Sequence, residues 1–222
     1  MPRKNDSQQT KQKVIEVATE IFMTKGYEST TMQDIVKGVN MSSGAIFHHY
    51  KSKKEILDAV ISSQEEWMTQ RYYEWLEEMK GFTARDKITA ILDKHLEIIK
   101  SHHIEEMHIG LNQSPQMVVS QMCSTVNKSA KYIEELFREG IQDGSIATED
   151  PNKCAQVFML LYNIWTDPNI ITCDYQEIES RMKYLQVLMK HVGADIVTDE
   201  NIKKTVEMYQ ELLLKATTLQ KS

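Results

Sequence analysis

The sequence has few of the residues that interrupt helices. Its 222 residues include only four prolines and eight glycines, and no segment alternates polar and apolar residues as a half-buried strand would. Residues that favour helices, such as Glu, Lys, Gln, Met and Leu, are abundant. The sequence therefore predicts an all-α protein, with helix start and stop signals for about nine or ten helices.

Cysteines are also few. Cys123, Cys154 and Cys173 are odd in number, lie far apart and form no CxxC pattern. This excludes a disulfide framework and the common zinc motifs, and it favours a reduced, cytoplasmic compartment. We expect the cysteines to be small buried residues, and we expect no metal site and no cofactor.

Long apolar runs are absent. No segment approaches the roughly 18 apolar residues that a membrane helix needs, and the first residues, MPRKNDSQQTKQK, lack the apolar core of a signal peptide. The sequence contains no P-loop, GxSxG or HExxH motif and no paired carboxylates in a catalytic pattern. Neither membrane association nor enzymatic activity is expected.

The charge is negative overall but unevenly distributed. The net charge is −6, yet residues 1–54 carry nine basic and five acidic side chains, a net of +4, which leaves −10 on the remainder. A basic N-terminal part on an acidic body is typical of a nucleic-acid-binding head attached to a body that does not touch DNA. A mixed solvated surface is the alternative explanation.

Helix boundaries are readable in the N-terminal part. Residues 10–25 place apolar side chains at helical spacing, and Gly26 ends that helix. A capping box at Thr31 opens a second short helix, Asn40 begins a turn, and a third short helix follows over about residues 43–50.

The same signals predict longer helices in the rest of the chain. A capping box at Ser52 opens a long connector over about residues 53–79. Further helices are expected from Thr83 towards Leu111, from Pro115 to Gly140 or Gly144, from Asp150-Pro151 to about Trp165, from Asp174 to Gly193, and from a cap at Asp199 to about Leu219.

One stretch combines these features in a familiar pattern. Its parts are Phe22, Lys25-Gly26-Tyr27, Thr30-Thr31, Asp34-Ile35, Val39 to Tyr50, and Lys51 to Leu57. Over roughly residues 8–60 the chain resembles the N-terminal helix-turn-helix domain of the TetR family of bacterial repressors. The resemblance implies a head over residues 1–55, with a basic arm, and a helical effector-binding and dimerisation domain over residues 56–222.

A short recognition helix can present one face to the major groove of double-stranded DNA. Small residues at its start let backbone amides approach a phosphate, while nearby imidazoles and ammonium groups can contact bases or phosphates. We expect DNA contacts from Thr31, Gln33, Ser42, Ser43, Gly44, Ala45, Phe47, His48, His49, Lys51 and Lys53. Thr31 could also serve as a helix cap. The arm residues Arg3 and Lys4 either enter the minor groove of DNA or belong to a solvated tail.

The recognition segment departs from the family at two positions. Phe47 stands where the family usually has a tyrosine that bonds a phosphate, and Ala45 replaces a frequent threonine. A phenyl ring has no hydroxyl, so Phe47 is expected to contact a sugar or a thymine methyl instead. Tyr50 is expected to pack in the core, together with Ile35, Val36, Val39, Ile46, Ile56 and Leu57.

The resemblance further implies a homodimer that binds a palindromic operator and responds to a small molecule. We expect the subunit interface at Val157, Leu160, Leu161, Ile164, Met182, Leu185, Leu188 and Met189. An intramolecular core explains the same apolar pattern.

The effector site is open to several interpretations. Methionine and aromatic residues suit an adaptable apolar pocket, for which the candidates are Trp67, Tyr72, Phe82, His103, Met107, Met122, Phe137, Tyr162 and Trp165. Ordinary core packing is the alternative for each of them. His95, His102, His103 and His108 lie on one predicted helix, which keeps haem or metal ligation open. A protein partner in place of an organic ligand is a further alternative.

Overall fold

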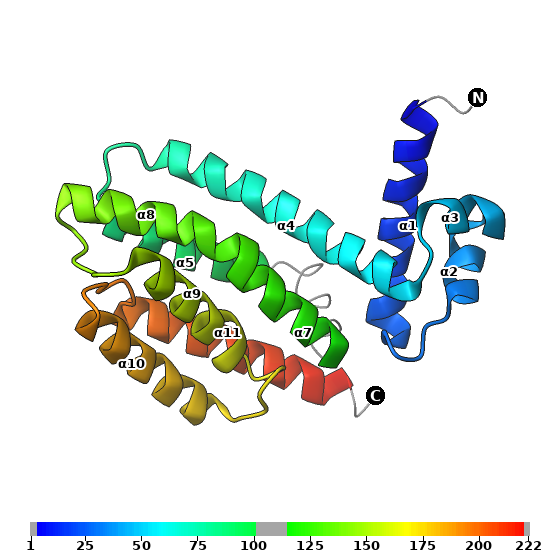
Figure 1. Cartoon of the computed structure of the whole chain (residues 1–222). Coiled ribbons are helices and arrows are strands. Elements are labelled where there is room, and N and C mark those ends of the chain that lie inside the picture. Colours follow the sequence, from blue (N-terminus) through cyan, green and yellow to red (C-terminus); the bar gives the residue numbers. More distant parts are fainter. Residues whose placement is uncertain (1–3, 101–114, 220–222) are drawn as a thin grey trace. The chain divides into compact units, whose positions relative to one another are not determined.

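The computed structural model describes residues 4–100 and 115–219 (Figure 1). Throughout these ranges the regular elements are helices, and none of the described residues lies in a strand. This confirms the all-α prediction. None of the described helices is long and apolar enough to cross a membrane.

The chain divides into two compact units. The first is Met1–Gln70 with Glu106–Gln121, and the second is Arg71–Glu105 with Met122–Ser222. The division falls inside one helix, α4 (Lys53–Glu78), which contributes residues to both units. The domain boundary predicted after residue 55 falls in the first turn of α4. It remains a prediction.

The first unit is built on α1 (Lys4–Lys25), α2 (Met32–Val39), α3 (Ser43–His49) and the first part of α4. These helices share one apolar core, which includes Val14, Ala18, Phe22, Tyr27, Ile35, Val39, Ile46, Tyr50, Ile56, Leu57 and Val60. The core positions predicted for α2, α3 and the start of α4 are confirmed, except that Val36 is only half-buried. Because α2 and α3 are short, this shared core must fix their positions.

The second unit is built on helices from the C-terminal two thirds of the chain. They are α5 (Ala84–Lys100), α8 (Ala130–Asp143), α9 (Pro151–Leu160), α10 (Tyr175–His191) and α11 (Asp199–Leu219). Two π-helical turns, η1 (Thr125–Ser129) and η2 (Leu161–Trp165), continue α7 (Pro115–Ser124) and α9. The buried residues of this unit include Ile88, Leu136, Phe137, Phe158, Ile178, Met182 and Leu185.

One helix start differs from the prediction, and one of the two glycines expected to end α8 does so. Helix α1 begins at Lys4, so most of the expected arm is helical, and residues 1–3 lie outside the described residues. Gly140 does not end a helix. It is buried within α8, where a Cβ atom would lie 2.7 Å from Ile146 Cδ1, so the absent side chain allows the following turn to pack closely. Helix α8 ends at the other predicted glycine, Gly144, in the left-handed conformation.

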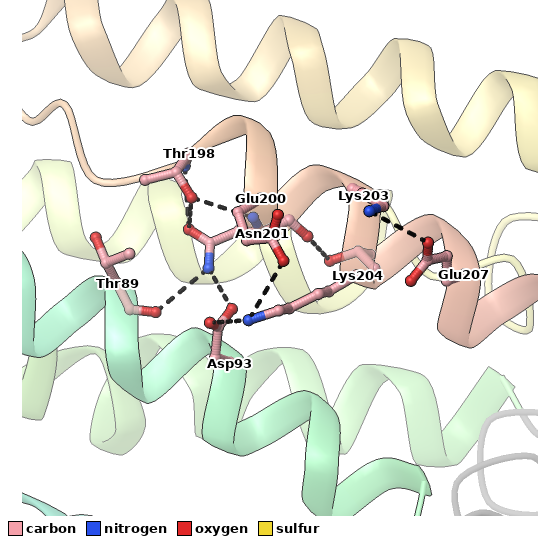
Figure 2. A network of polar contacts seen from close by, with 9 residues as sticks. Thr89, Asp93, Thr198, Glu200, Asn201, Lys203, Lys204 and Glu207 are labelled. Carbon is pink, nitrogen blue, oxygen red and sulfur yellow. Dashed lines mark hydrogen bonds and ion pairs between the residues drawn. The ribbon is translucent and has the colours of Figure 1, made fainter.

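The cap of α11 is Thr198, and the prediction of Asp199 is wrong. Thr198 N–H donates to Asn201 Oδ1 at 3.0 Å, and Asn201 N–H donates to Thr198 Oγ1 at 3.1 Å, which forms a reciprocal capping box. The same Asn201 amide joins α11 to α5. Its Nδ2 donates to Asp93 Oδ1 at 2.5 Å and to the Thr89 carbonyl at 3.3 Å, and Lys204 Nζ bonds Asp93 Oδ2 at 2.5 Å (Figure 2).

Candidate DNA interface and family

The start of α2 is fixed by hydrogen bonds centred on Asp34. Thr31 donates to Asp34 Oδ2 from its backbone N–H at 2.8 Å and from its hydroxyl at 2.7 Å. The Asp34 N–H returns a bond to Thr31 Oγ1, and Lys25 Nζ lies 2.6 Å from Asp34 Oδ2. The Lys25 bond, followed by those from Thr31, holds the pKa of Asp34 well below its usual range. Thr31 is therefore the helix cap, as one of its two interpretations predicted.

The turn into α3 has a tight geometry. Asn40 adopts the left-handed conformation at φ 54°, and its N–H bonds the Lys37 carbonyl. Ser42 then caps α3, because its Oγ accepts the Ala45 N–H at 3.3 Å. Asn is among the few side chains that tolerate the left-handed region, which explains why this residue occupies the turn.

Helix α3 has one buried side and one exposed side. Ile46 is completely buried in the shared core, whereas Ser43, Gly44, Phe47 and His48 are exposed. A Cβ atom at Gly44 would meet nothing within 4 Å. The sequence-predicted recognition residues therefore lie mainly on the open side of α3, with Ala45 half-buried. Gln33, on α2, is also exposed.

Two histidines occupy the last turn of α3. The rings of His48 and His49 lie 5.1 Å apart in an edge-to-face arrangement. Partial burial lowers the pKa of His49, and the positive charges of His48, Lys11 and Lys51 lower it further. His49 is therefore a half-buried group in a basic setting, while His48 is exposed.

The two predicted phosphate clamps differ in their surroundings. Lys51 is exposed, and its Nζ bonds the Phe47 carbonyl at the end of α3 at 2.5 Å. Lys53 Nζ bonds the carbonyls of Tyr27 and Glu28 at 2.6 and 3.2 Å and lies 4.2 Å from the centre of the Tyr27 ring. Lys53 thus ties the start of α4 to the loop after α1, a structural role that the sequence did not indicate.

The predicted subunit-interface residues fall into two groups. Val157 is exposed and Leu160, Leu161 and Leu188 are half-buried, whereas Ile164, Met182, Leu185 and Met189 are buried inside the second unit. These last four residues belong to the core of the second unit, which corrects their assignment to the subunit interface. The exposed apolar residues that the sequence reasoning missed are Tyr184, Val187 and Val192, and Trp165 packs 6.1 Å from Tyr184. Together Val157, Trp165, Tyr184, Val187, Leu188 and Val192 are named here the α9–α10 face.

The described pocket candidates lie in different settings. Trp67 belongs to the first unit, Phe82 is 52% exposed in the turn before α5, and Met122 is also exposed. Phe137 is core, and the Tyr72 hydroxyl is bonded to the Tyr132 carbonyl at 2.8 Å. His103 and Met107 lie outside the described residues.

Tyr162 is the pocket candidate with an unusual environment. It is buried on η2, and burial raises its pKa. Within the described part of the chain its hydroxyl has no hydrogen-bond partner of normal geometry. The ring of His95, on α5, lies 6.4 Å away between centroids. Of the four histidines considered for haem or metal, only His95 is described, and the described residues hold no cluster of three possible metal ligands.

Comparison with known proteins gives one consistent result. A family model described as "Bacterial regulatory proteins, tetR family" matches residues 14–60. The chain is 29% identical to the uncharacterized HTH-type transcriptional regulator YhgD of Bacillus subtilis, over 68% of this chain and 80% of that one. It is 25% identical to the HTH-type transcriptional repressor KstR2 of Mycolicibacterium smegmatis, over 60% of this chain and 65% of that one.

Other relatives and solved structures agree. The HTH-type transcriptional regulator QacR of Staphylococcus aureus is 25% identical over 79% of this chain and 92% of its own. The reduced form of E. coli NemR shares the fold with a TM-score of 0.60, at 16% identity over 81% of this chain and 96% of that one. The matched region, residues 14–60, contains the capped α2, the turn and the exposed side of α3. The helix-turn-helix head of the chain, residues 14–60, is that of the TetR family of DNA-binding transcriptional regulators.

Proposed function

We propose that the protein is a homodimeric repressor that binds a palindromic operator and is released by a small apolar or amphipathic molecule. The observation that carries the DNA-binding part is the exposed side of α3, with Ile46 anchored in the core opposite Ser43, Gly44 and Phe47. A helix held in this way presents a fixed set of side chains to a major groove.

The proposed contacts follow the accessibility of each residue. Ser43, Gly44, Phe47 and His48 face the groove from α3, and Gln33 does so from α2. Ser42, Ala45, His49, Lys51 and the cap residue Thr31 complete the DNA-binding surface at its edges. Lys53 is assigned to positioning, because its ammonium group is already bonded to two carbonyls.

The first test is binding to DNA from the protein's own promoter, by electrophoretic mobility shift. We expect binding that weakens as salt rises, since phosphate contacts release counterions. No shift at low salt with any such fragment would contradict the proposal.

Substituting Gly44 by glutamate should weaken operator binding about tenfold or more, because a carboxylate on the open side of α3 would face the phosphates and base edges. The fold should be unaffected, since there is open space at this position and an acidic side chain in the first turn suits the helix dipole. Gly44→Gln, with nearly the same shape and no charge, is the matched control. Equal affinities for the two variants would remove Gly44 from the interface.

Operator binding should strengthen as the pH falls, by several-fold between about pH 8 and about pH 6 at constant ionic strength. In the free protein, burial and the charges of His48, Lys11 and Lys51 keep the pKa of His49 low. A nearby phosphate raises that pKa, so binding takes up a proton, and affinity increases until the pH falls below the pKa of the free form. His49→Gln should flatten the profile; an unchanged slope would exclude His49 as the proton acceptor.

The homodimer part of the proposal is supported by the α9–α10 face, where Tyr184 is 64% and Val187 50% exposed. Apolar side chains concentrated on one surface are typical of a subunit interface. Two heads held by such an interface would read half-sites about one helical turn, or about 34 Å, apart.

The effector part is supported by Tyr162. The Thr205 side chain lies next to this buried hydroxyl but forms no hydrogen bond of normal geometry with it. A buried hydroxyl with incomplete hydrogen bonding destabilises the fold, and a ligand acceptor group placed beside it would relieve that cost. A thermal-shift screen with dyes, drugs, fatty acids and haem tests this, with Tyr162→Phe as the matched variant. A hit on the wild type that is weaker on Tyr162→Phe supports the assignment. A response only to haem, a metal ion or a protein partner would favour the alternative effectors.

A further inference from the structure

An apolar side chain is exposed on α3 among small and polar ones. The Phe47 ring is 41% exposed, although the neighbouring Ile46 is completely buried. Burying the phenyl group would be favourable, so its exposure on the DNA-facing side of α3 calls for an apolar partner supplied by the ligand.

The backbone that carries this ring is held in place. Phe47 O accepts a bond from Lys51 Nζ at 2.5 Å, and Tyr50 N–H bonds the Ile46 carbonyl at 2.9 Å. One turn earlier along the same side of α3 lie Ser43 and Gly44, both exposed, and Gly44 has open space where a Cβ would stand. The backbone at Phe47 is therefore held in place, and the space beside the ring at Gly44 is open to an approaching base.

The chemistry of the major groove limits what can pair with a phenyl ring. Base edges there present hydrogen-bond donors and acceptors, and the 5-methyl group of thymine is the apolar exception. Against a polar edge the ring would remove water without replacing its hydrogen bonds, which is unfavourable. Against the methyl group it buries apolar surface on both sides.

We propose that Phe47 is a specificity-determining residue that selects thymine at one position of each operator half-site by contact with its 5-methyl group. This inference rests on the proposed DNA-binding function. It assigns to the ring a base-reading role, as opposed to packing against a sugar, which would give affinity without preference for a base.

The test begins with selection of binding sites from random double-stranded DNA by the full-length protein. Each selected thymine is then replaced by deoxyuridine, which lacks only the 5-methyl group. We expect one position per half-site at which this replacement weakens wild-type binding about three- to fourfold, the effect of about one buried methyl group. Replacing both half-sites together should cost about tenfold.

Variants of Phe47 distinguish the loss of a specific base contact from a general loss of DNA affinity. Phe47→Ala should bind more weakly and should no longer distinguish thymine from deoxyuridine at that position. Phe47→Tyr keeps the ring and should keep the preference. If wild-type protein binds thymine and deoxyuridine equally at every position, or if Phe47→Ala still distinguishes them, the inference is wrong. If selection enriches no sequence at all, the failure lies with the proposed DNA-binding function itself.

Discussion

Replacing Tyr184 by glutamate should convert the proposed homodimer into monomers and reduce operator binding by about a hundredfold or more. Tyr184 is the most exposed residue of the α9–α10 face, at 64%, and its ring packs against Trp165. In a symmetric interface the change places two carboxylates in one apolar contact, where each loses its hydration. When the link between two heads is lost, so is the gain in effective concentration, which is commonly about 10²- to 10⁴-fold.

Light scattering coupled to size exclusion measures the oligomeric state, and mobility shift measures binding. Phe82→Glu is the matched control, because Phe82 is also an exposed aromatic residue, at 52%, but lies outside the α9–α10 face. We expect this control to stay dimeric and to bind normally. If Tyr184→Glu remains dimeric while keeping its operator affinity, the interface lies elsewhere on the second unit.

The features of the head that could be predicted from the sequence are local ones. The capping box at Thr31 joins residues three apart, and the core positions of α2 and α3 follow helical spacing. Lys53 could not be assigned in this way, because its carbonyl partners on Tyr27 and Glu28 are about 25 residues away in the chain. A lysine at a helix start looks the same in the sequence whether it binds phosphate or its own backbone.

The second unit was harder to predict because α10 is apolar on two sides. Met182, Leu185 and Met189 form the buried side, while Tyr184 and Val187 point outward. Both sides of α10 carry apolar residues, so helical spacing alone does not tell which side meets the neighbouring helices. The packing of α11, η2 and α9 against α10 decides it.

The Asn201 side chain should prove a large single contributor to the stability of the second unit. Asn201→Ala is expected to lower the free energy of unfolding by about 2–4 kcal/mol, from the loss of a helix cap and of buried hydrogen bonds. The side chain is only 1% exposed. Its oxygen accepts from the Thr198 N–H and hydroxyl, and its nitrogen donates to Asp93 and to the Thr89 carbonyl (Figure 2).

Urea unfolding of the full chain measures the change, with Lys203→Ala as control. Lys203 lies two residues further along α11 and is exposed, and its Nζ lies 4.0 Å from Glu207 Oε1 (Figure 2). Removing an exposed ion pair of this kind should cost no more than about 0.5 kcal/mol. Asn201→Asp separates the two roles of the amide. It keeps an oxygen for the Thr198 cap but sets a second carboxylate against Asp93, so this variant should lose the contribution of the Asp93 bond while retaining the cap. Equal stabilities for Asn201→Ala and Lys203→Ala would mean that α11 is held to α5 by apolar packing, with the polar network contributing little.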